Sequence, residues 1–178
     1  VTFDQVIAAA QATGKDIALQ AKRYEGYTVF INALVASAGG SIIENEGAAA
    51  ADTQLGLDTP AGKRAATLIS SLARSGAVGP ALSSMNETNA LNMFQDESTS
   101  GFMLNWPYVY AAMKGNDVPF MDDIAWTTYP RVDADKQSAP PFGGIELGVN
   151  SASQKPDLAW KAIQCITTED HQKAYMMG

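Results

Sequence analysis

Aromatic side chains near the ends of expected helices and strands are the residues best suited to bind a ligand in this sequence. A sugar presents an apolar C–H face, which suits an aromatic ring, and a rim of hydroxyl groups, which suits carboxylates and amides. Hydrogen bonds to charged groups are about twice as strong as neutral ones. Ring and carboxylate together therefore indicate a neutral, polyhydroxyl ligand. The rings concerned are Tyr24, Tyr27, Trp106, Tyr108 and Tyr110.

Two short segments combine such rings with hydrogen-bonding groups. The first is Tyr24-Glu25-Gly26-Tyr27, and the second is Asn105-Trp106-Pro107-Tyr108. The second stands where a predicted strand ends and a helix begins, which is the edge where ligands usually sit in open α/β sheets. The residue types alone leave open the alternative that these rings fill the core.

Candidates for catalysis are few. The single histidine, His171, lies in a polar helical pattern that indicates the surface, and the single cysteine, Cys165, lies in a pattern that indicates the core. Glu25 and Glu146 could act as a glycosidase pair only at a suitable separation, which the sequence does not set. We therefore expect no catalytic residues.

Metal and phosphate sites also have weak support. Asp122-Asp123 and the pair Asp133 and Asp135 are candidates for a hard cation, but acidic turns on a negatively charged protein explain them more simply. The glycine pairs at 39–40 and 143–144 lack the spacing of a phosphate-binding loop. We expect neither a metal nor a cofactor.

The composition excludes several classes of protein. The chain has 178 residues, of which 46% are hydrophobic and 17% charged, as in a globular protein of one domain. Its net charge of −7 argues against nucleic acid as a partner. No apolar run approaches the roughly 18 residues that a membrane helix needs. Because the chain starts at Val1 and ends in an interrupted helical pattern, we expect a piece of a longer protein.

Short helices and strands are predicted to alternate, which indicates an α/β fold. Capping, proline and periodicity signals predict helices over about residues 2–14, 27–38, 60–75, 87–94, 106–113 and 155–166. Short β-prone runs predict strands over residues 17–20, 99–105, 124–129 and 145–150. Residues 41–57 are predicted to form a surface loop or hairpin.

Three segments resemble motifs of family 1 extracellular solute-binding proteins, which serve ABC sugar importers, and their order is similar to that in the second lobe of the maltose-binding type. They are QAKRYEGY at 20–27, ALNMF at 90–94 with GFMLNWPY at 101–108, and GGIELGVNS at 143–151 followed by PDLAW at 156–160 and TTE at 167–169. The EGY and NWPY motifs are most similar to those of actinobacterial trehalose-binding lipoproteins.

The chain departs from the family pattern at two places. ESTSG at 97–101 stands where relatives often carry a polar or basic residue, and Ile145 stands where an aromatic residue often follows the glycine pair. Both differences leave the sugar preference open.

The resemblance implies a fold of the periplasmic-binding-protein type II class, in which two α/β lobes are joined by a hinge. Residues 1–142 would form the second lobe, residues 143–153 the hinge crossover strand, and residues 154–178 the start of helices that return to the missing first lobe.

The resemblance also implies a protein that binds a disaccharide, trehalose or a maltose-like glucoside, and passes it to an ABC permease. Glu25 would accept hydrogen bonds from hydroxyl groups, Trp106 and Tyr108 would stack on a sugar ring, Tyr27 would line the cleft, and Gly144 would offer its backbone N–H. The expected ligand-binding residues are Glu25, Tyr27, Trp106, Tyr108, Gly144 and Ile145.

The same resemblance implies a monomer that is extracellular or periplasmic and lipid-anchored to the cell membrane. Two other classes remain open at this point. A sugar-processing enzyme would turn over a glycoside, and the sensing domain of a transcription regulator would carry a basic helix-turn-helix.

Overall fold

The computed structural model describes residues 1–96 and 99–177, and contacts within it divide the chain into two units. The first unit is Val1–Pro141 and the second is Phe142–Gly178. The ESTSG motif at 97–101 therefore lies in part outside the described residues. Among the described residues, no helix combines the length and the apolar character needed to cross a membrane.

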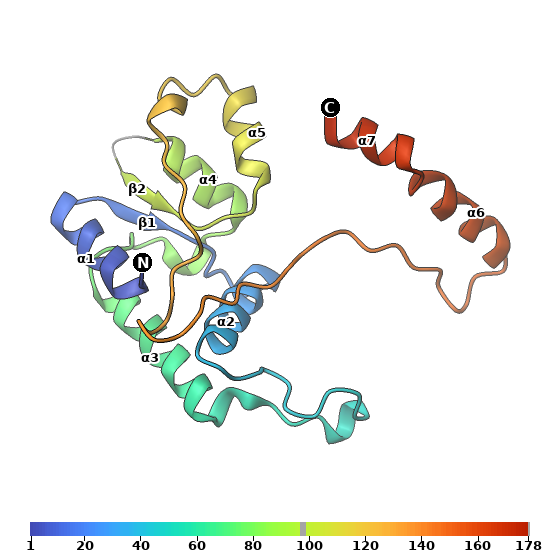
Figure 1. Cartoon of the computed structure of the whole chain (residues 1–178), viewed down its shortest axis with the longest axis horizontal. Coiled ribbons are helices and arrows are strands. Elements are labelled where there is room, and N and C mark those ends of the chain that lie inside the picture. The colour runs from blue at the N-terminus through green and yellow to red at the C-terminus, as the bar shows by residue number, and fades with distance from the viewer. Residues whose placement is uncertain (97–98, 178) are drawn as a thin grey trace. The chain divides into compact units, whose positions relative to one another are not determined.

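Up to α5, the first unit has the alternation of helices and strands that the sequence predicts. It contains α1 (Phe3–Thr13), β1 (Asp16–Ala18), α2 (Glu25–Ser37), α3 (Pro60–Arg74), α4 (Glu87–Gln95), β2 (Ser100–Met103) and α5 (Tyr108–Gly115), shown in Figure 1. Short 3-10 turns lie at Ala50–Asp52, Gly56–Asp58, Leu82–Ser84 and Met121–Asp123. The second unit contains α6 (Pro156–Ile166) and α7 (Glu169–Met177).

Local sequence signals set the bounds of α1. The Thr2 hydroxyl accepts a hydrogen bond from the Gln5 backbone N–H at 3.3 Å, and the Gln5 side chain accepts one from the Thr2 N–H at 2.9 Å. This reciprocal capping satisfies two N–H groups that the helix itself cannot pair. Gly14 ends the helix with a φ of 64°, a conformation that favours glycine. The predicted start and end of this helix are confirmed.

The same kind of signal starts α3. Thr59 caps the helix by accepting a hydrogen bond from the Gly62 N–H at 3.2 Å, and Pro60 occupies the first turn, where its missing N–H costs no hydrogen bond. Ala65, Leu68 and Leu72 form the buried stripe of the helix.

The two strands form a parallel sheet in which Ile17 pairs with Phe102 and Ala18 with Met103. Parallel pairing brings the carboxyl ends of both strands to one edge. Beyond the strands, the Leu104 N–H donates to the Ala18 carbonyl at 2.9 Å, and the Gln20 side-chain amide donates to the Leu104 carbonyl at 2.8 Å. The segments that lead into α2 and α5 therefore leave the sheet side by side.

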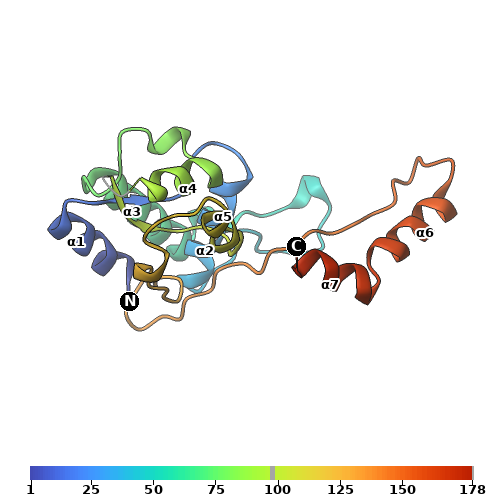
Figure 2. The same ribbon diagram turned by 90° about the horizontal axis from the view of Figure 1, so that it is seen from above.

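Helices cover the sheet on both sides. The main core joins residues of α1, α2, α3 and β1 with Val132. Two smaller cores involve α4, which lies against both strands (Figure 1, Figure 2), and α5. The starts of α2, α4 and α5 are therefore supported by well-packed hydrophobic cores.

Two predicted strands are wrong. Residues 124–129 are described throughout but form no strand, and only Tyr129 at their end packs on the main core. Residues 145–150 are extended and largely exposed, and residues 142–177 contain helices alone as regular structure. A strand needs a neighbour to pair with, and neither segment has one among the described residues.

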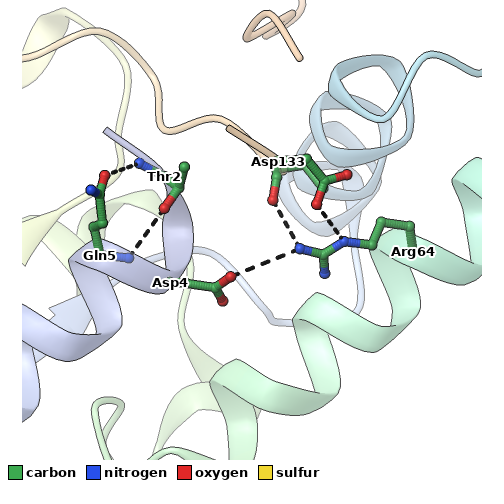
Figure 3. Close-up of polar contacts among 6 residues, drawn as sticks. Thr2, Asp4, Gln5, Arg64 and Asp133 are labelled. Carbon is green, nitrogen blue, oxygen red and sulfur yellow. Dashed lines mark hydrogen bonds and ion pairs between the residues drawn. The ribbon is translucent and has the colours of Figure 1, made fainter. Parts of the chain in front are cut away.

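A cluster of polar contacts around Arg64 joins both ends of the first unit to α3 (Figure 3). The Arg64 guanidinium donates to Asp133 Oδ1 and to the Val132 carbonyl, each at 2.9 Å, and lies 3.9 Å from Asp4 Oδ2. Close to these contacts, the Arg131 N–H donates to the Val1 carbonyl at 2.9 Å. Arg64 therefore adds polar contacts to the burial of Val132, and both attach this segment to the core.

Replacing Arg64 with alanine is expected to lower the free energy of unfolding by about 1–2 kcal/mol, because a half-buried charged hydrogen-bonding group is lost and solvent screens part of the effect. The matched control is Lys63→Ala, since Lys63 pairs with Asp58 on an exposed surface and its loss should cost less than about 0.5 kcal/mol. Urea denaturation of both variants measures the difference, and equal costs would show that the Arg64 contacts are incidental.

Candidate functional site

The starts of α2, α4 and α5 meet at the carboxyl edge of the sheet. The N–H groups of Ala21 and Lys22, on the way to α2, both donate to the carbonyl of Met85, which precedes α4, at 3.1 and 2.9 Å. The Asn105 side-chain amide, on the way to α5, donates to the carbonyl of Glu87 in α4 at 2.9 Å. The two motif segments predicted from the sequence thus lie on either side of the α4 start.

A carboxylate from α4 binds the first of these segments. The Tyr24 hydroxyl donates a hydrogen bond to Glu87 Oε2. Between them lies Gly26, where an added Cβ would be 2.5 Å from Tyr24 Oη and 2.7 Å from Glu87 Oε1. The missing side chain of residue 26 therefore leaves room for the tyrosine and the carboxylate to meet.

The charge of the same carboxylate acts on Tyr108 of the second segment. Partial burial raises the pKa of the Tyr108 phenol above its ordinary value, and the negative charge of Glu87 raises this pKa further. Hydrogen bonds from Asn105 and Thr88 act in the opposite direction. Glu87 therefore contacts Tyr24 directly and acts on Tyr108 through its charge. We call Tyr24, Gly26, Glu87, Asn105 and Tyr108 the edge cluster.

Trp106 is half-buried beside the edge cluster and contributes to the wall of a groove along β2. The groove has a volume of about 970 Å³. Tyr110 and Trp126 also line it, with their ring centroids 6.1 Å apart. Tyr108 is 44% exposed, so its ring is accessible from solvent. Of the predicted site residues, Trp106 lines this groove, whereas Glu25, Tyr27 and Tyr108 do not.

The other predicted site residues differ in their surroundings. Glu25 is exposed in the first turn of α2, next to Gly26 of the edge cluster, whereas Tyr27 is half-buried and packs against the main core. The sequence places Glu25 in a loop, but the helix begins two residues earlier than predicted and includes it. Gly144 and Ile145 are exposed in the second unit, and their part in a site stays a prediction.

Glu87 is the functional candidate that the sequence analysis misses. It occupies the first turn of α4, where an acidic residue is common because it interacts favourably with the helix dipole. The stretch before α4 contains no strand, so the rule about sheet edges gives no reason to single it out. The local signal is the capping box of Asn86 and Asn89, which marks where α4 begins.

The weaker candidates for catalysis or metal binding have other partners. Asp133 binds Arg64, and His171 Nδ1 lies 2.6 Å from the Cys165 carbonyl and 2.9 Å from Thr168 Oγ1 on an exposed surface. Cys165 is exposed, so the prediction that it lies in the core is wrong within this unit. Over residues 1–96 and 99–177, no three His, Cys, Asp or Glu side chains gather as metal ligands would.

Replacing Gly26 with alanine tests the close packing of the edge cluster. Alanine favours a helix interior by about 1 kcal/mol over glycine, but here its Cβ must displace the ends of Tyr24 and Glu87. We expect Gly26→Ala to leave the free energy of unfolding close to that of the parent, since losing a hydrogen bond costs about 1 kcal/mol and offsets this gain. The control is Gly115→Ala in α5, where nothing lies within 4 Å of the added Cβ. Urea denaturation that finds both variants equally stabilised would contradict the described packing.

Comparison with known proteins identifies the family. Residues 1–173 match the family described as bacterial extracellular solute-binding protein. A Deinococcus radiodurans protein named "Probable ABC transporter-binding protein" is 31% identical over 156 residues, which cover 86% of this chain and 35% of that protein. The chain thus spans about a third of the length of this relative.

A solved structure described as "Maltose bound T. maritima MalE3" has the same fold, with a TM-score of 0.77 and 24% sequence identity. The match covers 96% of this chain and 44% of that one. This likeness shows an α/β fold of the periplasmic-binding-protein type II class, which the resemblance of the sequence motifs implies. With the family match over nearly its whole length, the chain belongs to the bacterial extracellular solute-binding protein family.

Proposed function

We propose that this chain is part of the substrate-binding component of an ABC importer, and that it binds a neutral disaccharide without altering it. Its family consists of extracellular solute-binding proteins and is not an enzyme family. The name of the Deinococcus radiodurans relative refers to an ABC transporter, and the similar solved structure is that of a protein with maltose bound. Trehalose or a maltose-like glucoside fits the residue types of the site.

The observation that carries the proposal is the edge cluster. Tyr24 and Asn105, one from each motif segment, donate hydrogen bonds to the carboxylate and to the backbone carbonyl of Glu87 at the edge of the sheet. Rings beside a hydrogen-bond acceptor match a ligand that has C–H faces and hydroxyl groups. A purely structural core would bury these side chains, whereas Tyr108 is exposed and Tyr24 and Glu87 are half-buried.

In this proposal Trp106 and Tyr108 stack on a pyranose ring, and Glu25 accepts hydrogen bonds from its hydroxyl groups. Tyr27 lines the cleft below Glu25. Gly144 offers its backbone N–H from the second unit, next to Ile145. A neutral ligand bound in this way is released without chemical change, because none of these residues acts as a nucleophile or as a proton donor.

We propose the following arrangement for the protein as a whole. Residues 1–142 form the second lobe of a two-lobe clamp, residues 143–153 cross toward the first lobe, and residues 154–178 begin the helices that pack on it. The protein acts as a lipid-anchored monomer outside the cell membrane, and an ABC permease receives the sugar.

A thermal-shift screen of the full-length protein with mono- and disaccharides tests the function. A ligand that binds the folded state stabilises it by about 2.7 kcal/mol when present at one hundred times its Kd. We expect trehalose or a maltose-like disaccharide to raise the melting temperature and to remain intact in the mixture. An acidic sugar of similar size is the control, because two carboxylates at the site should repel it.

Two results would argue against this function. If no neutral sugar raises the melting temperature, the protein is not a sugar-binding component. If chromatography of the mixture finds glucose released from the disaccharide, the protein is an enzyme.

A further inference from the structure

Glu87 of α4 is hydrogen-bonded to the segments that precede α2 and α5. Its carboxylate accepts a hydrogen bond from the Tyr24 hydroxyl, which precedes α2. Its backbone carbonyl accepts a hydrogen bond from the Asn105 amide at 2.9 Å, and Asn105 Oδ1 in turn accepts one from the Trp106 N–H at the same distance. The side chain and the backbone of Glu87 thus each bind one of the two motif segments.

The carboxylate of Glu87 has more neighbours than an acidic residue in the first turn of a helix needs. Glu87 Oε2 accepts the Tyr24 hydrogen bond, and Oε1 lies over Gly26, where it would be 2.7 Å from an added Cβ. Tyr108 lies close enough for the charge of Glu87 to act on its phenol. An exposed acidic residue that only favours the helix dipole would have no need of these partners.

We infer that Glu87 is a positioning residue, which holds the Tyr24 ring through its carboxylate, and Asn105 with Trp106 through its backbone carbonyl, in the orientation that receives the sugar. The inference rests on the proposed function. Rings that are already fixed lose less conformational freedom when the ligand binds, so the affinity is higher than for mobile rings. Glu87 acts through Tyr24 and Asn105 and does not itself need to touch the ligand.

Titration calorimetry of the full-length protein with the sugar found in the thermal-shift screen tests the inference. Glu87→Ala removes the acceptor for Tyr24 and should weaken binding about tenfold, roughly the effect of one lost hydrogen bond plus the added ring mobility. Glu87→Gln keeps an acceptor oxygen and should recover part of the affinity. Tyr24→Phe removes the donor and should resemble Glu87→Ala. Glu169→Gln, in the first turn of α7, is the control for an acidic residue outside the cluster and should bind as the parent does.

A second measurement does not depend on the sugar. In carbon-13 NMR of labelled tyrosine, the pKa of Tyr108 should fall in both Glu87→Ala and Glu87→Gln, because each removes the charge that raises it. Parent-like affinity in Glu87→Ala would overturn the inference, and so would an unchanged Tyr108 pKa in Glu87→Gln. A parent protein that binds no sugar would instead overturn the proposed function, while the Tyr108 titration would still test the contact.

Discussion

Replacing Phe3 with alanine is expected to lower the free energy of unfolding of the first unit by about 3–5 kcal/mol, because a large buried ring is lost. Phe3 is 1% exposed, and its ring centroid lies 6.1 Å from that of Phe30 in α2 and 5.7 Å from that of Tyr129. Both ring pairs have edge-to-face geometry, which adds to the contribution of burial. One side chain therefore joins α1, α2 and the end of the segment 124–129.

Urea denaturation followed by circular dichroism measures this effect. The matched control is Phe142→Ala, because the Phe142 side chain is fully exposed and its loss should change stability by less than about 0.5 kcal/mol. A Phe3→Ala variant that loses less than about 1 kcal/mol would show that the main core is not packed as described.

Replacing Trp106 with alanine is expected to weaken sugar binding by about 1–3 kcal/mol, or roughly 5- to 150-fold in Kd. The reason is the loss of a ring face at the start of α5, beside the edge cluster. The variant should remain folded, since Trp106 is only half-buried. Titration calorimetry of the full-length protein gives both Kd values.

Trp160→Ala is the control for this measurement. Trp160 is also a tryptophan, is 55% exposed and lies on α6, to which the proposal assigns no role in binding. Its loss should leave the Kd unchanged. Glu25→Ala should also weaken binding, because it removes an acceptor from the start of α2. If Trp106→Ala and Glu25→Ala both bind as tightly as the parent, the sugar binds elsewhere.

The helices could be predicted from the sequence because their signals are local. The capping pairs of Thr2 with Gln5 and of Thr59 with Gly62 involve residues within one turn, so the pattern alone specifies the contact. Strands lack this property, because each needs a partner that the local sequence does not name. Strands within residues 17–20 and 99–105 pair with each other, whereas residues 124–129 have the same β-prone composition and form no ladder.

The candidate site could be predicted in part for the same reason. Tyr24 and Trp106 belong to segments whose residue types indicate sugar chemistry, and their place at the sheet edge follows from parallel pairing. Glu87 could not be found in this way, because its importance comes from contacts with Tyr24 and Asn105, which lie 63 and 18 residues away. Long-range packing therefore decides which acidic residue joins the site.

Fluorine-19 NMR of the full-length protein labelled with fluorotryptophan tests the location of the ligand most directly. Trp106, Trp126 and Trp160 are the tryptophans of this chain, so the Trp106→Ala spectrum assigns the Trp106 signal. We predict that saturating disaccharide shifts the Trp106 signal, because a sugar ring stacks on its face. A protein that binds the disaccharide while the Trp106 signal stays unchanged would contradict the site described for this chain.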